Sequence, residues 1–197
     1  MHLYILYAHS GRNTFCRAVL GAFRRGLSDS GHTSEIHDLC RTDSNCRLNP
    51  VEYIRETGLE PEAPVPEDIK REHERIAKAD ALGFIYPLWW SDVAAVLKGW
   101  FDRVWTYGYA CFYAADKQRT TKINIAKAVL LCSAGHTAKH LETTGIAKSM
   151  RQIMIQDRLL GVGVKHAGMS IPGGMMPHDN SYRKRNLETA YSVGKQL

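Results

Sequence analysis

The strongest constraint on the fold is a strand–loop–helix–strand pattern at the start of the chain. Residues 3–8, LYILYA, form a short apolar and aromatic run that is typical of a buried strand. From about Asn13 the apolar residues change to helical spacing, and those between Phe15 and Leu27 fall on one face. Residues 33–39, TSEIHDL, then alternate like a second strand. Two strands joined through a helix predict an α/β fold with parallel strands and a right-handed crossover.

The same pattern recurs along the chain and predicts five strands in all. Five strands that alternate with helices predict a doubly wound sheet, whose ligand binds at the carboxyl ends of the strands. The other strands are expected at residues 81–87, 125–135 and 161–174, and the other helices at about 67–80, 91–105, 138–160 and 181–193.

Length and composition favour one globular domain over residues 1–197. The chain is long enough for a substantial core, and 44% hydrophobic with 23% charged residues is ordinary for a globular protein. Residues 40–67 are polar and contain four prolines. Because the strand–helix pattern resumes after them, we expect a long surface loop rather than a linker between domains.

Several classes of protein do not fit the sequence. No apolar run approaches the roughly 20 residues that span a membrane, and the start lacks the features of a signal peptide, so a cytoplasmic protein is expected. The five cysteines are irregularly spaced, which predicts reduced thiols and no structural zinc. The net charge of +6 is scattered, so no nucleic-acid partner is expected.

The loop after the first strand, AHSGRNTF, has groups that suit a phosphate. Ser10, Asn13 and Thr14 can donate hydrogen bonds, Arg12 supplies positive charge, and the next helix begins here with free amides. The loop matches neither the Walker nor the GxGxxG pattern. A polar turn that only caps a helix would explain the same residues, so both interpretations stay open.

The loop after the third strand, YPLWWSD, holds two adjacent tryptophans. Trp89 and Trp90 cannot both lie on one helical stripe, so one is expected to face inward or into a cleft. An indole at a strand end can lie against a flat conjugated ligand, whereas a buried core pair is the alternative. Ser91 or Asp92 is expected to cap the following helix.

The loop after the fourth strand, CSAGHT, offers a close approach and a titratable group. Gly135 lets the backbone come near a ligand, and His136 can donate a proton, although a helix cap would also explain the loop. His136 and His140 have a spacing that metal ligands use on a helix. Because HExxH and a third ligand are missing, no metal is expected, and the absence of GxSxG argues against a hydrolase.

Taken together, the three loops resemble the NAD(P)H:quinone oxidoreductase (DT-diaphorase-like) family of flavodoxin-like flavoproteins. Residues 7–15, YAHSGRNTF, resemble its flavin-phosphate loop. Residues 86–113, in which YPLWW leads into LKGWFDRV, resemble its most distinctive block. Residues 133–136, SAGH, stand where the family usually has Thr-Thr-Gly-Gly. The resemblance covers most of the chain and implies a flavodoxin-like five-stranded parallel sheet in the order 2-1-3-4-5.

The family resemblance implies a flavoenzyme. FMN or FAD would be bound non-covalently, NAD(P)H would be the electron donor, and the flavin would pass a hydride to a quinone-like acceptor. By position, the resemblance implies that the phosphate and ribityl chain of the flavin are contacted by His9, Asn13, Thr14 and Phe15, with Arg12 as an added charge. The flavin ring would be walled by Pro87, Leu88, Trp89, Trp90 and Ser91, and its polar edge would be approached by Ser133, Ala134, Gly135 and His136. Tyr109 and Tyr113 would roof the acceptor pocket, and His136 and Tyr113 are the catalytic candidates.

The third loop departs from the family pattern. Ala134 replaces a hydroxyl residue, His136 replaces a glycine, and the usual tyrosine further on has no counterpart near Leu141. His136 is therefore expected either to supply the proton relay or only to fill space. Trp90 is expected to border the ring, with the Trp89 backbone along its edge.

The resemblance also bears on partners and on other functions. An aromatic patch of Trp105, Tyr107, Tyr109 and Tyr113 is expected to form the interface of a homodimer. Two other functions stay open. One is a flavodoxin-like regulatory subunit of a partner protein, and the other is a specialised flavoenzyme that reduces one metabolite.

Overall fold

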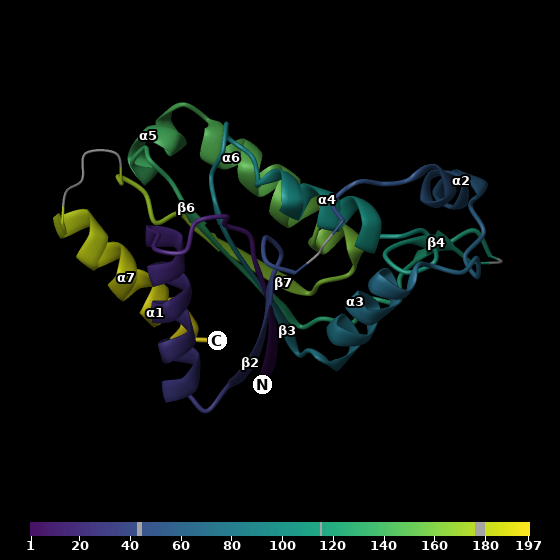
Figure 1. The fold of residues 1–197 in the computed structure, drawn as a ribbon, viewed down its shortest axis with the longest axis horizontal. Helices are drawn as coiled ribbons and strands as arrows, with labels where there is room; N and C mark the ends of the chain where they lie inside the picture. Colours follow the sequence, from purple (N-terminus) through teal and green to yellow (C-terminus); the bar gives the residue numbers. More distant parts are fainter. Residues whose placement is uncertain (43–44, 115, 176–179) are drawn as a thin grey trace.

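The computed structural model describes residues 1–42, 45–114, 116–175 and 180–197. Its centre is a five-stranded parallel sheet in the order β2-β1-β3-β6-β7, shown in Figure 1. Counted along the chain within this sheet, the order is 2-1-3-4-5, so the predicted doubly wound arrangement is confirmed. The strands are β1 (His2–Tyr7), β2 (Thr33–Asp38), β3 (Ala81–Pro87), β6 (Lys127–Ser133) and β7 (His166–Ser170).

Helices cover both faces of the sheet. In β1, Leu3 and Ile5 join a core cluster with α1 and α7, whereas Tyr4 and Leu6 join a second cluster with α3 and α4. A strand buried on both faces reads as a continuous apolar run, which is why LYILY was recognisable in the sequence. The covering helices are α1 (Phe15–Asp29) and α7 (Asn180–Lys195) on one side, and α3 (Glu67–Lys78) and α4 (Ala95–Val104) on the other.

The first and last helices touch backbone to backbone. A Cβ on Gly26 of α1 would lie 2.1 Å from the Tyr191 carbonyl oxygen, and one on Gly194 of α7 would lie 2.3 Å from the Phe23 carbonyl oxygen. Only glycine permits so close an approach. Figure 1 shows the two helices side by side, so the end of the chain completes one face of the core.

The segment 40–67 is not simply a loop, and that prediction is wrong in part. It contains helix α2, Pro50–Gly58. The Asn49 side chain accepts a hydrogen bond from the Glu52 amide, and the Glu52 carboxylate accepts one from the Asn49 amide at 2.9 Å. This reciprocal capping box, with proline at the first helical position, is a known signature of a helix start, and it is visible in the sequence NPVE of residues 49–52. The assignment of residues 1–197 to a single domain stays a prediction.

The helix after β3 begins later than expected. Ser91 or Asp92 was predicted to cap it, but α4 starts at Ala95, and Ala94 provides no side-chain cap. The predicted cap is wrong because residues 89–92 form a tight turn of their own instead.

The remaining elements extend the molecule at both ends. The stretch after β6 contains α5 (Ala138–Thr143), α6 (Ile146–Arg151) and a π-helical segment (Gln152–Asp157). A small antiparallel pair, β4 (Phe112–Tyr113) and β5 (Arg119–Thr120), lies beside α2 at the end opposite α7 (Figure 1). Within the ranges described, no helix has the length and apolar character needed to cross a bilayer.

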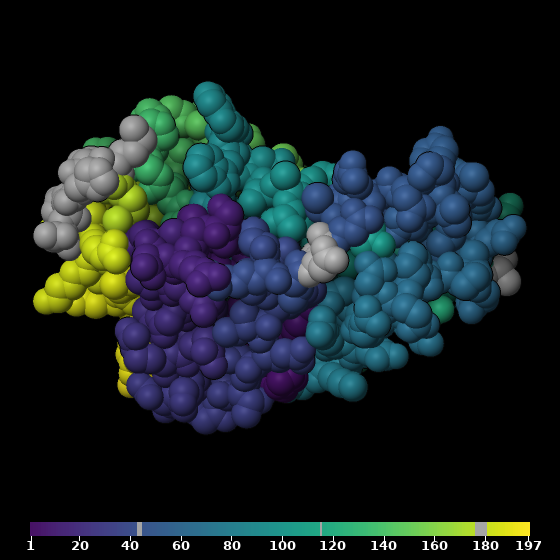
Figure 2. Space-filling view, in the orientation of Figure 1, coloured from purple at the N-terminus to yellow at the C-terminus, as the bar shows by residue number. Residues whose placement is uncertain are grey.

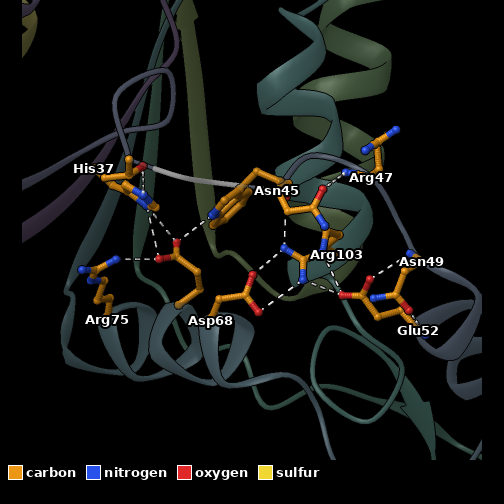
Figure 3. Close-up of polar contacts among 11 residues, drawn as sticks. His37, Asn45, Arg47, Asn49, Glu52, Asp68, Arg75 and Arg103 are labelled. Carbon is orange, nitrogen blue, oxygen red and sulfur yellow. Dashed lines mark hydrogen bonds and ion pairs between the residues drawn. The ribbon is translucent and has the colours of Figure 1, made fainter.

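Arg103 of α4 fastens α2 and α3 to the body of the protein. Its side chain is only 6% exposed. The guanidinium donates to Glu52 of α2 at 2.8 Å, to Asp68 of α3 at 3.2 Å and to the Asn45 carbonyl at 3.0 Å. Figure 3 shows Arg103 between these acceptors. On the same helix, a Cβ at Gly99 would lie 2.1 Å from the Cys46 carbonyl oxygen, so this glycine lets the segment before α2 pack against α4.

A second buried charge is Glu72, which lies on α3 one turn beyond Asp68. Glu72 accepts hydrogen bonds from the Tyr4 hydroxyl at 2.6 Å and the Trp100 indole at 2.7 Å, and Arg75 pairs with its other oxygen. Burial alone would raise the pKa of Glu72, but hydrogen bonds from His37, Tyr4 and Trp100 outweigh it and lower that pKa to about 2. The cavity of about 300 Å³ between α3 and α4 is lined in part by these paired charges, among them Asp68, Glu72 and Arg103.

Candidate functional site

A larger and mostly apolar cleft opens at the carboxyl ends of β1, β3 and β6. Its volume is about 630 Å³, within the range of cofactor pockets, and it lies where a doubly wound sheet binds ligands. The predicted residues that line it are His9, Phe15, Pro87, Leu88, Trp89, Trp90, Ser91, Ser133, Ala134, Gly135 and His136, and four lining residues that were not predicted are Cys16, Leu141, Ile146 and Met175.

One wall of the cleft is a two-residue turn in an unusual backbone conformation. Trp89 and Asp92 exchange backbone hydrogen bonds of 3.0 and 3.2 Å. Between them, Trp90 and Ser91 have φ values of 47° and 67°, the left-handed region that normally favours glycine. Each such residue is strained by roughly 1–2 kcal/mol. Strain of this kind is characteristic of sites where a side chain must be presented in a fixed place.

The turn presents its aromatic side chains to solvent. Trp90 is 99% exposed and Trp89 is 59% exposed, so the alternative of a buried core pair is wrong. Figures 1 and 2 show the turn after β3 standing out from the surface at the top of the view. Both side chains line the cleft, so a flat ligand there would contact an indole that water otherwise surrounds.

The first loop supplies polar groups of two kinds. His9 lines the cleft, and its Nδ1 accepts a hydrogen bond from the Gly11 amide at 2.9 Å, which leaves the proton of the neutral ring on Nε2 as a donor. Burial lowers the pKa of His9, against a smaller opposing effect of Asp38, and so favours that neutral form. The Thr14 side chain instead accepts from the Arg17 amide and caps α1.

Three predicted phosphate ligands, Arg12, Asn13 and Thr14, lie outside the cleft wall. Arg12 and Asn13 are exposed on the loop, beside the positive end of α1. The capping interpretation of this loop therefore holds for Thr14, and a phosphate role for Arg12 and Asn13 stays a prediction.

The loop after β6 forms the edge of the cleft opposite the turn of residues 89–92. Ala134 is buried, with its amide bonded to the Pro172 carbonyl at 3.1 Å and its carbonyl to the Met175 amide at 3.3 Å. This pairing brings Met175 to the cleft. His136 is exposed at the rim, and its ring stacks on that of His140.

The floor beneath the cleft contains cysteines that are chemically quiet. Burial raises the pKa of the Cys16 thiol to about 12, and burial does the same for Cys132. Thiols held protonated are poor nucleophiles, so these side chains act as small apolar residues. Across the described ranges, no group of three or more potential ligands is arranged to hold a metal ion.

The two predicted acceptor residues do not reach the cleft within one protomer. Tyr109 stacks on His73 of α3, with the two ring centroids 3.6 Å apart. Burial raises the pKa of its hydroxyl. Tyr113 is 61% exposed on β4, and neither tyrosine is among the lining residues. Neither tyrosine therefore forms part of this cleft in a single chain.

Comparison with known proteins agrees with this fold and cleft. The model of a family described as having a flavodoxin-like fold matches residues 1–188, and the chain belongs to that family. A solved NAD(P)H:quinone oxidoreductase from Methanothermobacter marburgensis is 58% identical, with a TM-score of 0.95 over 100% of this chain and 96% of that chain.

Curated relatives extend the same similarity. An uncharacterized NAD(P)H oxidoreductase of Haemophilus influenzae is 25% identical over 191 residues, which are 96% of this chain and 92% of the relative. NAD(P)H dehydrogenase [quinone] 1 of Cavia porcellus is 33% identical over 163 residues. That match covers 76% of this chain but only 59% of the relative.

Proposed function

We propose that this protein is a flavin-dependent NAD(P)H oxidoreductase that transfers a hydride from NAD(P)H, through FMN or FAD, to quinone-like acceptors. The observation that carries the proposal is the apolar cleft at the strand ends, with an exposed indole on one wall and polar loops on two others. The names of the relatives from Methanothermobacter and Cavia agree with this activity.

The residues of the cleft fit a flavin. A slab-shaped ring system suits the apolar wall of Pro87 to Ser91, and the Gly135 backbone supplies polar groups at its edge. His9 offers a donor towards the phosphate side, with Arg12 and Asn13 beside it. When bound, the flavin supplies the hydride chemistry, and the protein positions it and excludes competing reactions.

The chain's own contribution to the chemistry is a proton. Reduction of a quinone consumes two electrons and two protons, and a hydride brings both electrons with one of the protons. We propose that His136 donates the remaining proton from its protonated imidazolium form to the acceptor oxygen, because it is an exposed titratable side chain at the open rim of the cleft. A proton from the solvent then restores the imidazolium.

Purification and turnover test this function. The protein should carry or take up FMN or FAD and appear yellow, and chromatography of the extracted cofactor should identify which flavin it is. With NADH or NADPH, it should reduce quinones faster than azo dyes or nitroaromatics. A colourless protein that binds neither flavin would overturn the proposal.

We also propose that two copies of the chain associate through α2 and β4. The usual orientation of an amphipathic helix is reversed in α2: Glu52 and Arg55 face the protein, whereas an apolar face is exposed to solvent. This α2 apolar face consists of Val51, Tyr53, Ile54 and Leu59, which are 59–76% exposed.

The α2 apolar face continues towards Tyr113. Glu56 of α2 accepts a hydrogen bond from the Tyr107 amide at 2.7 Å, and the Tyr107 hydroxyl approaches the Tyr113 amide at 3.4 Å. A second copy is the occupant we propose, because Tyr113 can meet a cleft only in another protomer. Trp105 and Tyr109 of the expected aromatic patch are instead partly covered by their own chain.

The mass in solution tests the association. At micromolar concentration the protein should have twice the mass of one chain, and Ile54→Asp should convert it to a monomer. Thr189→Asp places the same charge on an exposed position of α7 and should leave the dimer intact. A dimer that survives Ile54→Asp, or a monomeric parent protein, contradicts this interface.

Two other functions have distinct signatures. A regulatory subunit would co-purify with a partner and turn over slowly, whereas a specialised flavoenzyme would prefer one metabolite over every quinone tested. The altered SAGH loop is the feature that favours the second of these. A cytoplasmic location is part of the proposal and is supported by five cysteines that are all free thiols.

A further inference from the structure

Two histidines at the rim of the cleft form a stacked pair. His136 and His140 have ring centroids 4.5 Å apart and an interplanar angle of 26°. His136 lines the cleft, whereas His140 is not among the residues that line it. The two rings therefore occupy different positions with respect to a bound acceptor, although they have the same chemistry.

Backbone hydrogen bonds fix the main chain that carries both rings. The His136 carbonyl accepts a hydrogen bond from the Gly174 amide at 2.8 Å, which ties the loop after β6 to the segment after β7. The His140 amide donates to the Thr137 side chain at 3.1 Å, and its carbonyl accepts from the Thr144 amide at 3.0 Å. His140 lies in the first turn of α5 and His136 just before the helix cap Thr137, and the two rings meet across this helix start.

An exposed imidazole on a loop would otherwise sample several rotamers. His136 is exposed, so its own backbone does little to fix the direction of the ring. A group that transfers a proton must be held close to one productive geometry, commonly by the side chains packed behind it. Among the described residues, the ring contact recorded for His136 is the one with His140.

We propose that His140 is a positioning residue for His136: its ring holds the His136 imidazole at the rim of the cleft, where His136 donates a proton to the acceptor. This inference rests on the proposed function, since the proton is the one that completes reduction of a quinone by NAD(P)H. His140 does not touch the acceptor, and an aromatic ring of similar size can take its place.

Steady-state turnover with NADH or NADPH and a quinone tests the role. His140→Ala should lower kcat about tenfold with little change in KM, which is less than the 10²–10⁴ that a general acid itself contributes. His140→Phe keeps a flat ring in the stack and should stay within about twofold of the parent. Lys139→Ala, on the same exposed turn, is the matched control and should leave kcat unchanged.

The double variant separates positioning from a general structural effect. In a His136→Ala background, His140→Ala should cause no further loss, because the ring that it positions is already absent. Equal and additive losses would show that His140 acts by another route and would overturn the inference. Parent-level kcat in His140→Ala would overturn it as well.

A spectroscopic measurement on flavin-free protein tests the stack without turnover. The ring protons of His136 should carry a ring-current shift in NMR spectra that is lost in His140→Ala and kept in His140→Phe. His136 shifts that are the same in all three proteins contradict the stack. If the parent protein fails to oxidise NAD(P)H, the proposed function fails, whereas these shifts still report on the pair.

Discussion

The block between residues 86 and 113 contains two neighbouring regions built on opposite principles. The turn of residues 89–92 is strained, exposed and held by its own backbone bonds. Helix α4, only three residues later, is held by buried charges that find partners on α2 and α3. The part that presents groups to a ligand is therefore not the part that stabilises the fold, although one stretch of sequence encodes both.

The difference shows what the letters LKGWFDRV specify. Lys98 pairs with Asp102 on the surface, while Trp100 and Arg103 reach acceptors on α3 and α2. These residues fasten the α2 segment beside the sheet and do not line the cleft. A motif of this kind thus includes residues whose contacts here hold α2 and α3 against α4 and lie outside the cleft.

The largest effect should come from breaking the buried charge network. Arg103→Ala leaves the buried Glu52 carboxylate without its partner and should lower the free energy of unfolding by about 3–5 kcal/mol. Lys98→Ala, on the exposed face of the same helix, removes the pair with Asp102 and should lower it by less than about 1 kcal/mol. Denaturant unfolding measures both, and equal losses would contradict the distinction.

Glu72 should make the free energy of unfolding depend on pH in the acidic range. Its folded pKa of about 2 lies below the ordinary value of 4.5, so its contribution is present above about pH 4.5 and is lost as the pH falls towards 2. The loss should approach about 3 kcal/mol. Unfolding of Glu72→Gln followed between pH 2 and 5 should lack this component, whereas Glu74→Gln on the exposed side should keep it.

Gly99 tests how closely the α2 segment must approach α4. Gly99→Ala forces the Cys46 backbone away and should lower the free energy of unfolding by about 1–3 kcal/mol. Gly58→Ala is the matched change, because nothing lies within 4 Å of the added methyl group at the end of α2. It should be neutral or slightly stabilising, and a loss there as large as at Gly99 would argue against close packing as the cause.

The last substitution lies in the turn of residues 89–92, and it should raise the free energy of unfolding rather than lower it. Trp90→Gly relieves a left-handed residue whose side chain is almost wholly exposed, so the protein should gain about 1 kcal/mol. Its Kd for FMN or FAD should nevertheless rise about tenfold if the indole borders the ring. Ser91→Gly relieves the same turn without removing an aromatic ring and should leave that Kd unchanged, as measured by flavin titration.

Much of the fold could be predicted because local patterns carry it. The buried strands are apolar runs, and the three loops at their ends were visible in the sequence together with most of the cleft residues. The start of α2 was also readable in Asn49, Pro50 and Glu52, but the prolines that follow suggested a loop. That miss came from composition outweighing a capping signal.

Other features could not be derived from local patterns. The pairing of Arg103 with Glu52 joins residues 51 positions apart, and nothing near either one indicates its partner. The left-handed turn at Trp90 and Ser91 lacks the glycine or asparagine that usually marks such a turn. The position of Tyr113, remote from the cleft, depends on how β4 folds back beside α2 rather than on its spacing from other aromatics.

The close contact between α1 and α7 has a consequence for the order in which the protein is made. Helix α1 is synthesised early, yet the part of its surface around Gly26 packs against a helix that begins at Asn180. At ordinary rates of translation the interval between them is roughly ten to thirty seconds. Throughout that time a nascent chain has an uncovered apolar surface near its beginning. Yield in the cell should therefore respond to chaperone supply and to the speed of translation as well as to the stability of the finished fold.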